Sequence, residues 1–189
     1  MALNAENQPT GHLAHPPAKP LIVVMGVSGV GKTTLAELLA DRLGLPYAEA
    51  DDFHPAANIA KMSAGIPLDD RDRAPWLAAL GGWLGERGRA GTGGVVTCSA
   101  LKRRYRDTLR AACPDAYFLH LDGGHGLVEH RLAARTGHFM PASLLDSQYA
   151  LLEPLQPDER GAVLDVGPAP HELVEKAVAL LRPVNGDLA

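Results

Sequence analysis

Short apolar runs alternate along this chain with longer segments in which apolar residues recur every three or four positions. Most of the runs have the length and the Val, Ile and Leu content of buried strands, and the run at residues 47–50 is a shorter one. They predict strands over residues 21–25, 47–50, 95–98, 116–121 and 162–166. The longer segments predict helices that end at glycine or proline. These helices are expected up to residue 43 and over 56–64, 101–111, 127–135, 141–153 and 172–181, with one more that is capped by Asp70 or Asp72 and carries Trp76 and Trp83.

The alternation of strands and helices predicts the fold class. It favours an α/β fold with three layers, in which helices cover both faces of a five-stranded parallel sheet. Residues 20–189 are expected to form one domain, and the Pro- and His-rich residues 1–19 a disordered tail. Ligands of such a fold bind beyond the carboxyl ends of the strands. Residues 26–33, 51–54 and 99–102 are therefore the candidates for a site.

A glycine-rich loop follows the first predicted strand. Residues 26–33 read GVSGVGKT and match G-x-x-x-x-G-K-[ST] between a strand and a helix, as a P-loop requires. Glycines let several backbone N–H groups converge on one anion, and the helix start adds its positive dipole end. Lys32 is then a catalytic cation for the β- and γ-phosphates of ATP, and Thr33 a ligand of Mg²⁺. The predicted nucleotide-binding residues are Gly26, Val27, Ser28, Gly29, Val30, Gly31, Lys32, Thr33 and Thr34.

Polar residues after the second predicted strand suit an acceptor alcohol. A kinase needs a carboxylate that orients the hydroxyl group and accepts its proton, and Asp51 is the first choice. The alternative is that Asp51 caps the next turn or orders water around Mg²⁺. His54, Asn58 and Lys61 share one helix face and could bind a polyhydroxy substrate, or could form a solvated face.

Two basic stripes are the remaining candidates. Lys102 and Arg106 follow a strand end and could bind a substrate carboxylate or phosphate, although a solvated face or an RNA-binding patch has the same pattern. Arg131 and Arg135 precede the helix breakers of residues 137–141. They predict a mobile lid over approximately residues 127–145, whose arginines stabilise the transferring phosphoryl group. Ordinary surface arginines are the alternative.

Composition excludes several classes of function. The net charge of −4 and the aromatic content of 5% argue against nucleic-acid binding. Two cysteines give no disulfide framework and suit a reducing cytoplasm. The histidines form no zinc motif, and no apolar stretch is long enough to span a membrane.

Four segments together resemble the gluconate kinases of the P-loop small-kinase group. They read GVSGVGKTT, ADDFHPAANIAKMSAGIPLDDRDRAPWL, CSALKRRYRDTLR and RTGHFMPASLLDSQYALLE. The resemblance implies that ATP and Mg²⁺ phosphorylate D-gluconate at its 6-hydroxyl group, giving 6-phospho-D-gluconate and ADP. It also implies a homodimer in the cytoplasm, Asp51 facing the sugar, Arg131 and Arg135 in the lid, and His138 among the substrate-binding residues.

Three rival functions remain open at this point. A kinase of another hydroxy acid such as shikimate shares the P-loop and the layout. A nucleotide-gated regulatory module would hydrolyse ATP slowly and needs a partner surface. A nucleic-acid end kinase would use the basic stripe at residues 102–110, against the net charge.

Overall fold

The computed structural model describes residues 19–134 and 142–181. Its five strands are β1 (Leu21–Met25), β2 (Tyr47–Ala48), β3 (Gly94–Thr97), β4 (Tyr117–Asp122) and β5 (Gly161–Asp165). They form one sheet in the order β2-β3-β1-β4-β5, and every pair is parallel. The predicted fold class is therefore confirmed. The predicted tail lies outside the described residues except for Lys19, and residues 135–141 of the predicted lid also lie outside them.

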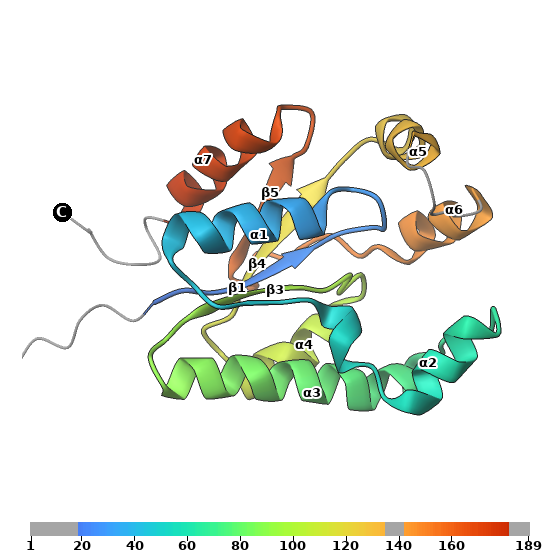
Figure 1. The fold of residues 1–189 in the computed structure, drawn as a ribbon, viewed down its shortest axis with the longest axis horizontal. Coiled ribbons are helices and arrows are strands. Elements are labelled where there is room, and N and C mark those ends of the chain that lie inside the picture. The colour runs from blue at the N-terminus through green and yellow to red at the C-terminus, as the bar shows by residue number, and fades with distance from the viewer. Residues whose placement is uncertain (1–18, 135–141, 182–189) are drawn as a thin grey trace, which may run out of the picture.

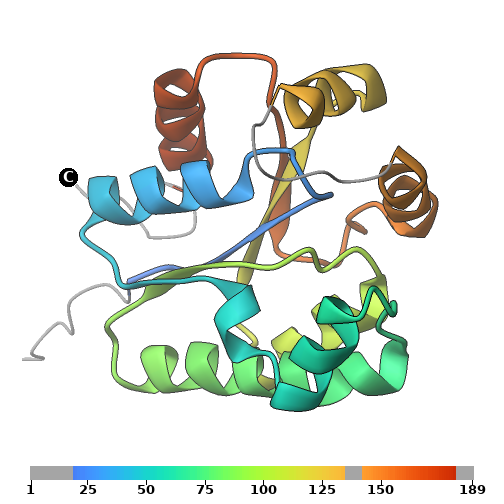
Figure 2. The same ribbon diagram turned by 45° about the vertical axis from the view of Figure 1, so that its right-hand side comes forward.

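Helices cover both faces of the sheet (Figure 1). Helices α1 (Lys32–Leu43) and α7 (Pro170–Leu181) lie on one face, and α3 (Asp70–Arg89) and α4 (Arg103–Ala112) on the other. Helices α2 (Ala56–Ser63), α5 (His125–Ala133) and α6 (Ala142–Leu151) lie beyond the carboxyl ends of the strands. Figure 2 shows the same arrangement with α2 nearer the viewer. The three short helices therefore frame the edge at which ligands of this fold bind.

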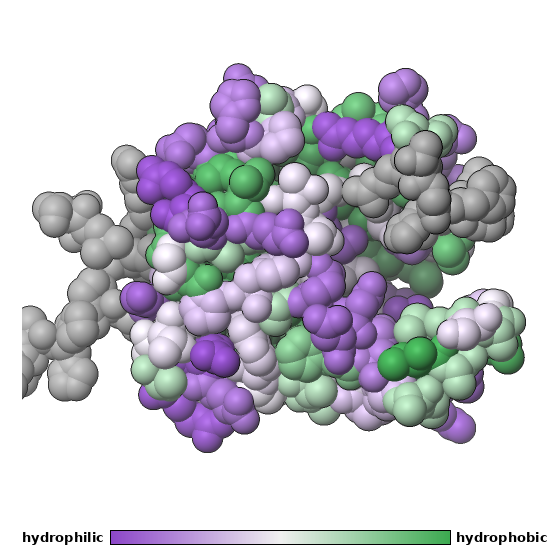
Figure 3. All heavy atoms as spheres, in the orientation of Figure 1, coloured by the Kyte–Doolittle hydropathy of each residue, from purple (hydrophilic) through white to green (hydrophobic). Residues whose placement is uncertain are grey.

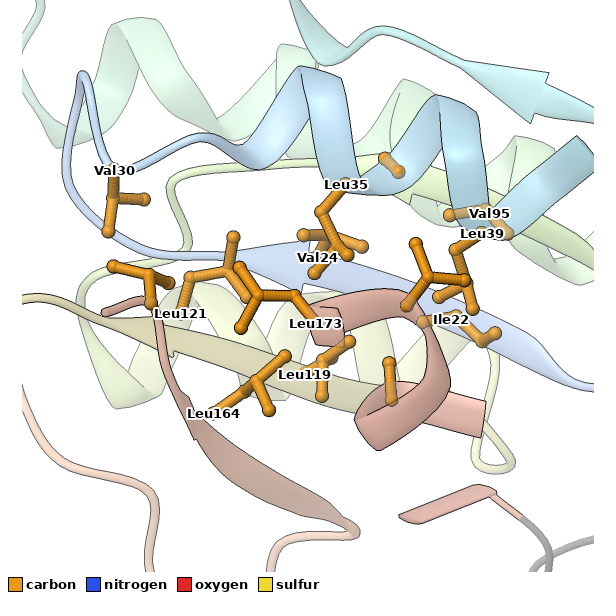
Figure 4. Packing of buried hydrophobic residues seen from close by; sticks show 14 of the residues in the cluster. Ile22, Val24, Val30, Leu35, Leu39, Val95, Leu119, Leu121, Leu164 and Leu173 are labelled. Carbon is orange, nitrogen blue, oxygen red and sulfur yellow. The ribbon is translucent and has the colours of Figure 1, made fainter. Parts of the chain in front are cut away.

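Two apolar cores explain why the strands are uniformly apolar. Ile22 and Val24 of β1 pack toward α1 and α7 in one core, which Figure 4 shows from close by. Val23 and Met25 alternate with them and pack under α3 and α4 in the other core. Because both faces are covered, neither set can be polar. Within residues 19–134 and 142–181, no helix is long and apolar enough to cross a membrane.

The second strand is shorter than predicted. Pairing stops at Ala48, and a 3₁₀ helix, η1 (Ala50–Phe53), follows. The N–H of Ala50 donates to Thr97 Oγ1 at 3.2 Å, and its carbonyl accepts from Trp76 Nε1 at 2.7 Å. Side chains thus replace the ladder partners at this edge of the sheet.

The cap of α3 also differs from the prediction. Asp69 is the N-cap, and its carboxylate accepts from the N–H of Asp72 at 2.9 Å. The carboxylate of Asp72 accepts in return from the N–H of Asp69 at 3.0 Å. This reciprocal capping box satisfies two donors, so the helix begins one residue before the nearer of the two predicted starts.

Candidate active site

The loop between β1 and α1 has the backbone that its glycines predict. Gly26, Gly29 and Gly31 have φ angles of 140°, 80° and 106°. A Cβ atom on Gly26 would lie 2.7 Å from the carbonyl oxygen of Leu121, so a side chain does not fit there. Gly31 is the N-cap of α1, and Lys32 Nζ donates across the loop to the carbonyl of Val27 at 3.0 Å. The N–H groups at the helix start therefore face the hollow of the loop.

A cleft of about 780 Å³ opens on one side of this loop. Its walls come from the P-loop, η1, α2 and the segment after it, the start of α3, the end of β3, and α6. Figure 3 shows apolar surface over α2 on its outer side. The residues of the cleft used below are Ser28, Lys32, Thr33, Glu49, Asp51, His54, Arg73, Trp76, Ser99 and Gln148.

A second pocket of about 440 Å³ lies on the other side of the loop. Gly29 and Gly31 line both cavities, whereas Val30, Thr34 and Arg131 line only the second. Arg131 donates to the carbonyls of Val30 at 3.4 Å and Val166 at 2.7 Å. A molecule that spans the loop can therefore reach both cavities, as a nucleoside triphosphate with its acceptor would.

Asp51 faces the same cleft as Lys32. Both backbone groups of the preceding residue, Ala50, are bonded to Thr97 and Trp76, which fixes the start of η1. The side chain of Asp51 is exposed. The backbone carbonyl of Asp51 accepts a hydrogen bond from the N–H of His54 at 3.3 Å. A carboxylate on a backbone fixed in this way can orient a hydroxyl group toward the phosphate loop.

His54 packs on the buried indole of Trp76, with ring centroids 4.6 Å apart and planes 10° apart. Burial lowers the pKa of His54. The negative charge of Asp51 raises this pKa and the positive charge of Arg73 lowers it, so that the pKa of His54 is lowered overall. Asn58 is buried and donates to the carbonyl of Asp72 at 2.8 Å, with His54 Nδ1 at 3.3 Å. Trp76 is buried in the core and also forms part of the cleft wall.

Comparisons with known proteins agree with this geometry. The sequence model of a family described as an AAA domain matches residues 21–155. A gluconokinase of Gluconobacter oxydans is 56% identical over 138 residues, which cover 73% of this chain and 78% of that protein. The thermosensitive gluconokinase of Escherichia coli is 45% identical over 141 residues, covering 75% of each chain. The chain belongs to the gluconokinase family.

A solved structure of a gluconokinase supports the same assignment. A gluconokinase from Sinorhizobium meliloti superposes with a TM-score of 0.81 at 45% identity, covering 89% of this chain and 95% of that one. A shikimate kinase from Aquifex aeolicus, at 15% identity and a TM-score of 0.55, covers 86% of this chain and 96% of that one and shows a shared fold alone. This chain is thus a P-loop kinase of the gluconokinase family, and the resemblance read from the sequence is confirmed.

Four residues predicted to bind substrate do not line the cleft of this gluconokinase-family fold: Asn58, whose contacts are given above, Lys61, Lys102 and Arg106. Lys61 pairs with Asp72 at 2.6 Å, and Lys102 lies 3.4 Å from Asp70, and neither lysine lines the cleft. Arg106 is fully buried against Glu159 at 2.6 Å. The assignment of Arg106 to the substrate is therefore corrected: its periodic position faces the core, where the carboxylate of Glu159 compensates its charge. Arg135 and His138 lie outside the described residues.

Glu49 is a cleft residue that the sequence reasoning missed. Its carboxylate accepts from the hydroxyl groups of Thr33 at 3.1 Å, of Tyr47 and of Thr97. Burial and the hydrogen bond to Glu49 raise the pKa of Tyr47. The sequence signal that could have revealed Glu49 is an acidic residue directly after a strand, at the edge of the sheet where ligands bind.

Arg73 and Gln148 were also missed. Arg73 is half-buried in the cleft wall, donates to the carbonyl of Leu68 at 3.3 Å, and lies 5.8 Å from the ring centroid of Tyr105. Among the described residues that line the cleft, the Lys and Arg side chains are Lys32 and Arg73. Gln148 reaches the cleft from α6, 120 residues beyond the P-loop serine that it contacts. No spacing pattern marks either residue, although both lie within the segments that carry the family resemblance, which could have revealed them.

Proposed function

We propose that this chain transfers the γ-phosphoryl group of ATP to the 6-hydroxyl group of D-gluconate, giving 6-phospho-D-gluconate and ADP. The observation that carries the proposal is that one cleft holds both the P-loop with Lys32 and the carboxylate of Asp51. The gluconokinases at 56% and 45% identity support gluconate as the acceptor.

The two cavities on either side of the P-loop bind different parts of the substrates. The triphosphate lies on the loop, with its nucleoside end toward the pocket of Arg131 and its γ-phosphoryl group toward the cleft. Asp51 accepts a hydrogen bond from the 6-hydroxyl group and takes its proton. The alcohol oxygen bonds to the γ-phosphorus as the bond to the β,γ-bridging oxygen breaks, while Lys32 balances charge on the phosphates. Arg131 stabilises the side of the loop that faces the nucleoside, and Arg135 remains a residue predicted to stabilise charge on the transferring phosphoryl group.

The oxygen donors near the loop fit Mg²⁺. The hydroxyl group of Thr33 and the carboxylate of Glu49 are adjacent, and both are hard ligands. In the described part of the chain, no cluster of three His, Cys, Asp or Glu residues could hold a metal ion. Thr33 and Glu49 would therefore hold the ion together with phosphates and water, as Mg²⁺ prefers. When bound, it would neutralise charge on the β- and γ-phosphates.

Arg73 is the best candidate for the gluconate carboxylate. It lines the cleft with Asp51 and His54, and its planar guanidinium matches a carboxylate. Replacing Arg73 by Met should lower kcat/KM for gluconate by about 10- to 150-fold, the value of a hydrogen bond to a charged group. Arg71→Met is the matched control, since Arg71 is exposed on the same helix and does not line the cleft. Equal losses in both variants would remove Arg73 from this role.

The proposed reaction is tested by ADP formation with D-gluconate, with shikimate and without acceptor. Of the three reactions, we expect rapid ADP formation only in the one that contains D-gluconate. Its product should give the phosphorus NMR signal of a primary phosphate ester at carbon 6. Equal ADP formation in all three reactions would favour a nucleotide-hydrolysing module. Turnover with shikimate alone would move the enzyme to another acceptor.

We also propose a homodimer and a cytoplasmic location. The exposed side chain of Ile59 on α2, with the apolar surface over this helix in Figure 3, supports association through an apolar surface. The free, buried Cys98 and Cys113 support a reducing compartment. Light scattering coupled to size exclusion tests the dimer: a mass near 40 kDa is expected from a 20.0 kDa chain, and a mass near 20 kDa rejects it.

A further inference from the structure

The side-chain carbonyl of a residue on α6 accepts a hydrogen bond from one backbone N–H group of the P-loop. The N–H of Ser28 donates to Oε1 of Gln148 at 2.7 Å, and both residues line the cleft. A backbone nitrogen can only donate, so the amide oxygen of Gln148, and not its nitrogen, must face Ser28. Gln148 thus places a partial negative charge in the hollow of the loop where phosphate oxygens bind.

The position of Ser28 indicates which phosphate competes with Gln148. Gly29 and Gly31 line both cavities, whereas Ser28 lines only the cleft that contains Asp51. The nucleoside pocket lies on the opposite side of the loop. The N–H of Ser28 therefore lies at the acceptor end of the triphosphate, beside the γ-phosphoryl group.

The helix that carries Gln148 is anchored on both sides of the cleft edge. The hydroxyl group of Tyr149 donates to the carbonyl of Gly123 at 2.6 Å, and the N–H of Glu153 donates to the carbonyl of Leu101 at 2.8 Å. With the helix fixed in this way, the amide of Gln148 can turn about its own side-chain bonds. Its NH₂ group, a double donor, can then replace its carbonyl at the same place.

We propose that Gln148 is a positioning residue that distinguishes ATP from ADP at the P-loop. Without nucleotide, its carbonyl holds the N–H of Ser28. When a γ-phosphate oxygen takes that N–H, the amide turns and its NH₂ group donates to the γ-phosphoryl group. The proposal rests on the proposed binding of ATP, but not on the identity of the acceptor.

The test is the ratio of two dissociation constants, for β,γ-methylene-ATP and for ADP, each with Mg²⁺ and measured by calorimetry. Gln148→Glu keeps the length of the side chain, accepts the Ser28 N–H more strongly, cannot donate, and repels the γ-phosphate. We expect the ratio to rise by about 10-fold or more, because a charged contact replaces a neutral one. Ser147→Glu is the matched control: it makes the same charge change on the same helix, at an exposed residue outside the cleft lining. Its ratio should stay within about 2-fold of the wild type.

A second variant removes the donor of Gln148 without adding a charge. Gln148→Met has a similar size and no donor, and it should lower kcat/KM for ATP by about 2- to 12-fold while the ADP dissociation constant stays unchanged. Equal shifts for ADP and the ATP analogue, or a shift in Ser147→Glu as large as in Gln148→Glu, would overturn the proposal. Because the binding measurements contain no gluconate, failure of the proposed acceptor would leave them interpretable.

Discussion

Arg106 joins two segments that support the cleft from behind. Its guanidinium makes six hydrogen-bond contacts from five N–H groups, so two contacts of Nη1 share one hydrogen, and two of the six go to the carboxylate of Glu159 at 2.6 and 2.9 Å. The other four go to the carbonyls of Ala100, Leu101, Glu153 and Pro154. The first two carbonyls follow Ser99, a residue of the cleft, and the last two follow α6. Replacing Arg106 by Met should therefore affect both stability and catalysis.

The size of the effect follows from burial. Both side chains of the pair have 0% exposure, so removing Arg106 leaves an uncompensated carboxylate in the core. Removing one partner of a buried pair costs about 3–5 kcal/mol, against a typical total of about 5–15 kcal/mol. For a domain of this size, the loss lowers Tm by about 6–20 °C. Replacing both Arg106 and Glu159 by Met should recover part of the loss, because no charge is then left buried.

Urea unfolding at pH 7 of the two single variants and the double variant measures these free energies. The double variant should lose less than the sum of the single losses. Arg42→Met is the control, since Arg42 makes its ion pair to Glu175 at the surface, far from Glu159 in the sequence, and should change stability by about 1 kcal/mol or less. A loss below about 1 kcal/mol in Arg106→Met would refute the reasoning, because it would mean that no uncompensated carboxylate is left buried in the core.

The pair also predicts a dependence on pH. Burial by itself raises the pKa of Glu159, but hydrogen bonds from Arg106 and from the N–H of Gln156 lower it overall below its usual 4.5. At pH values near and below 4.5, the unfolded chain therefore binds more protons at Glu159 than the folded chain does. The stabilisation is complete above pH 4.5 and is lost as the pH falls below that value. Thermal melts between pH 3 and 7 should show this acid-side loss in the wild type and not in Glu159→Gln, and equal curves would contradict it.

Asp51→Asn should lower kcat by about 100-fold or more while ADP binds normally, and unchanged turnover would exclude Asp51 as the base. Gly26→Ala would place a Cβ atom 2.7 Å from the carbonyl oxygen of Leu121 and should abolish nucleotide binding in calorimetry. Burial lowers the pKa of His120 below 6.5, so its contribution to stability is complete above that pH and falls as the pH drops. Melts at pH 7.5 and 5.5 should differ less in His120→Gln than in the wild type. Trp76→Phe should lower stability by about 1–3 kcal/mol in urea unfolding, since it leaves the carbonyl before Asp51 without its donor.

Local patterns determined the sheet and the nucleotide loop from the sequence alone. Strand β1 and helix α1 end where the apolar pattern and Gly44 predict, because strand periodicity and glycine caps depend only on neighbouring residues. The loop from Gly26 to Thr33 is likewise recognised from spacing, since its glycines meet a backbone requirement. The early end of β2 escaped this reasoning because Thr97 and Trp76, distant in sequence, replace its ladder partners.

Only the tertiary structure decided which charged side chains reach the cleft. Arg106 and Arg73 are both arginines near strand or helix starts, yet one faces the core and the other the cavity. What separates them is Glu159, 53 residues beyond Arg106, whose carboxylate compensates the buried charge. Gln148 meets Ser28 across 120 residues in the same way. Such pairings depend on how the helices dock, and a pattern with a period of two or four residues carries no information about them.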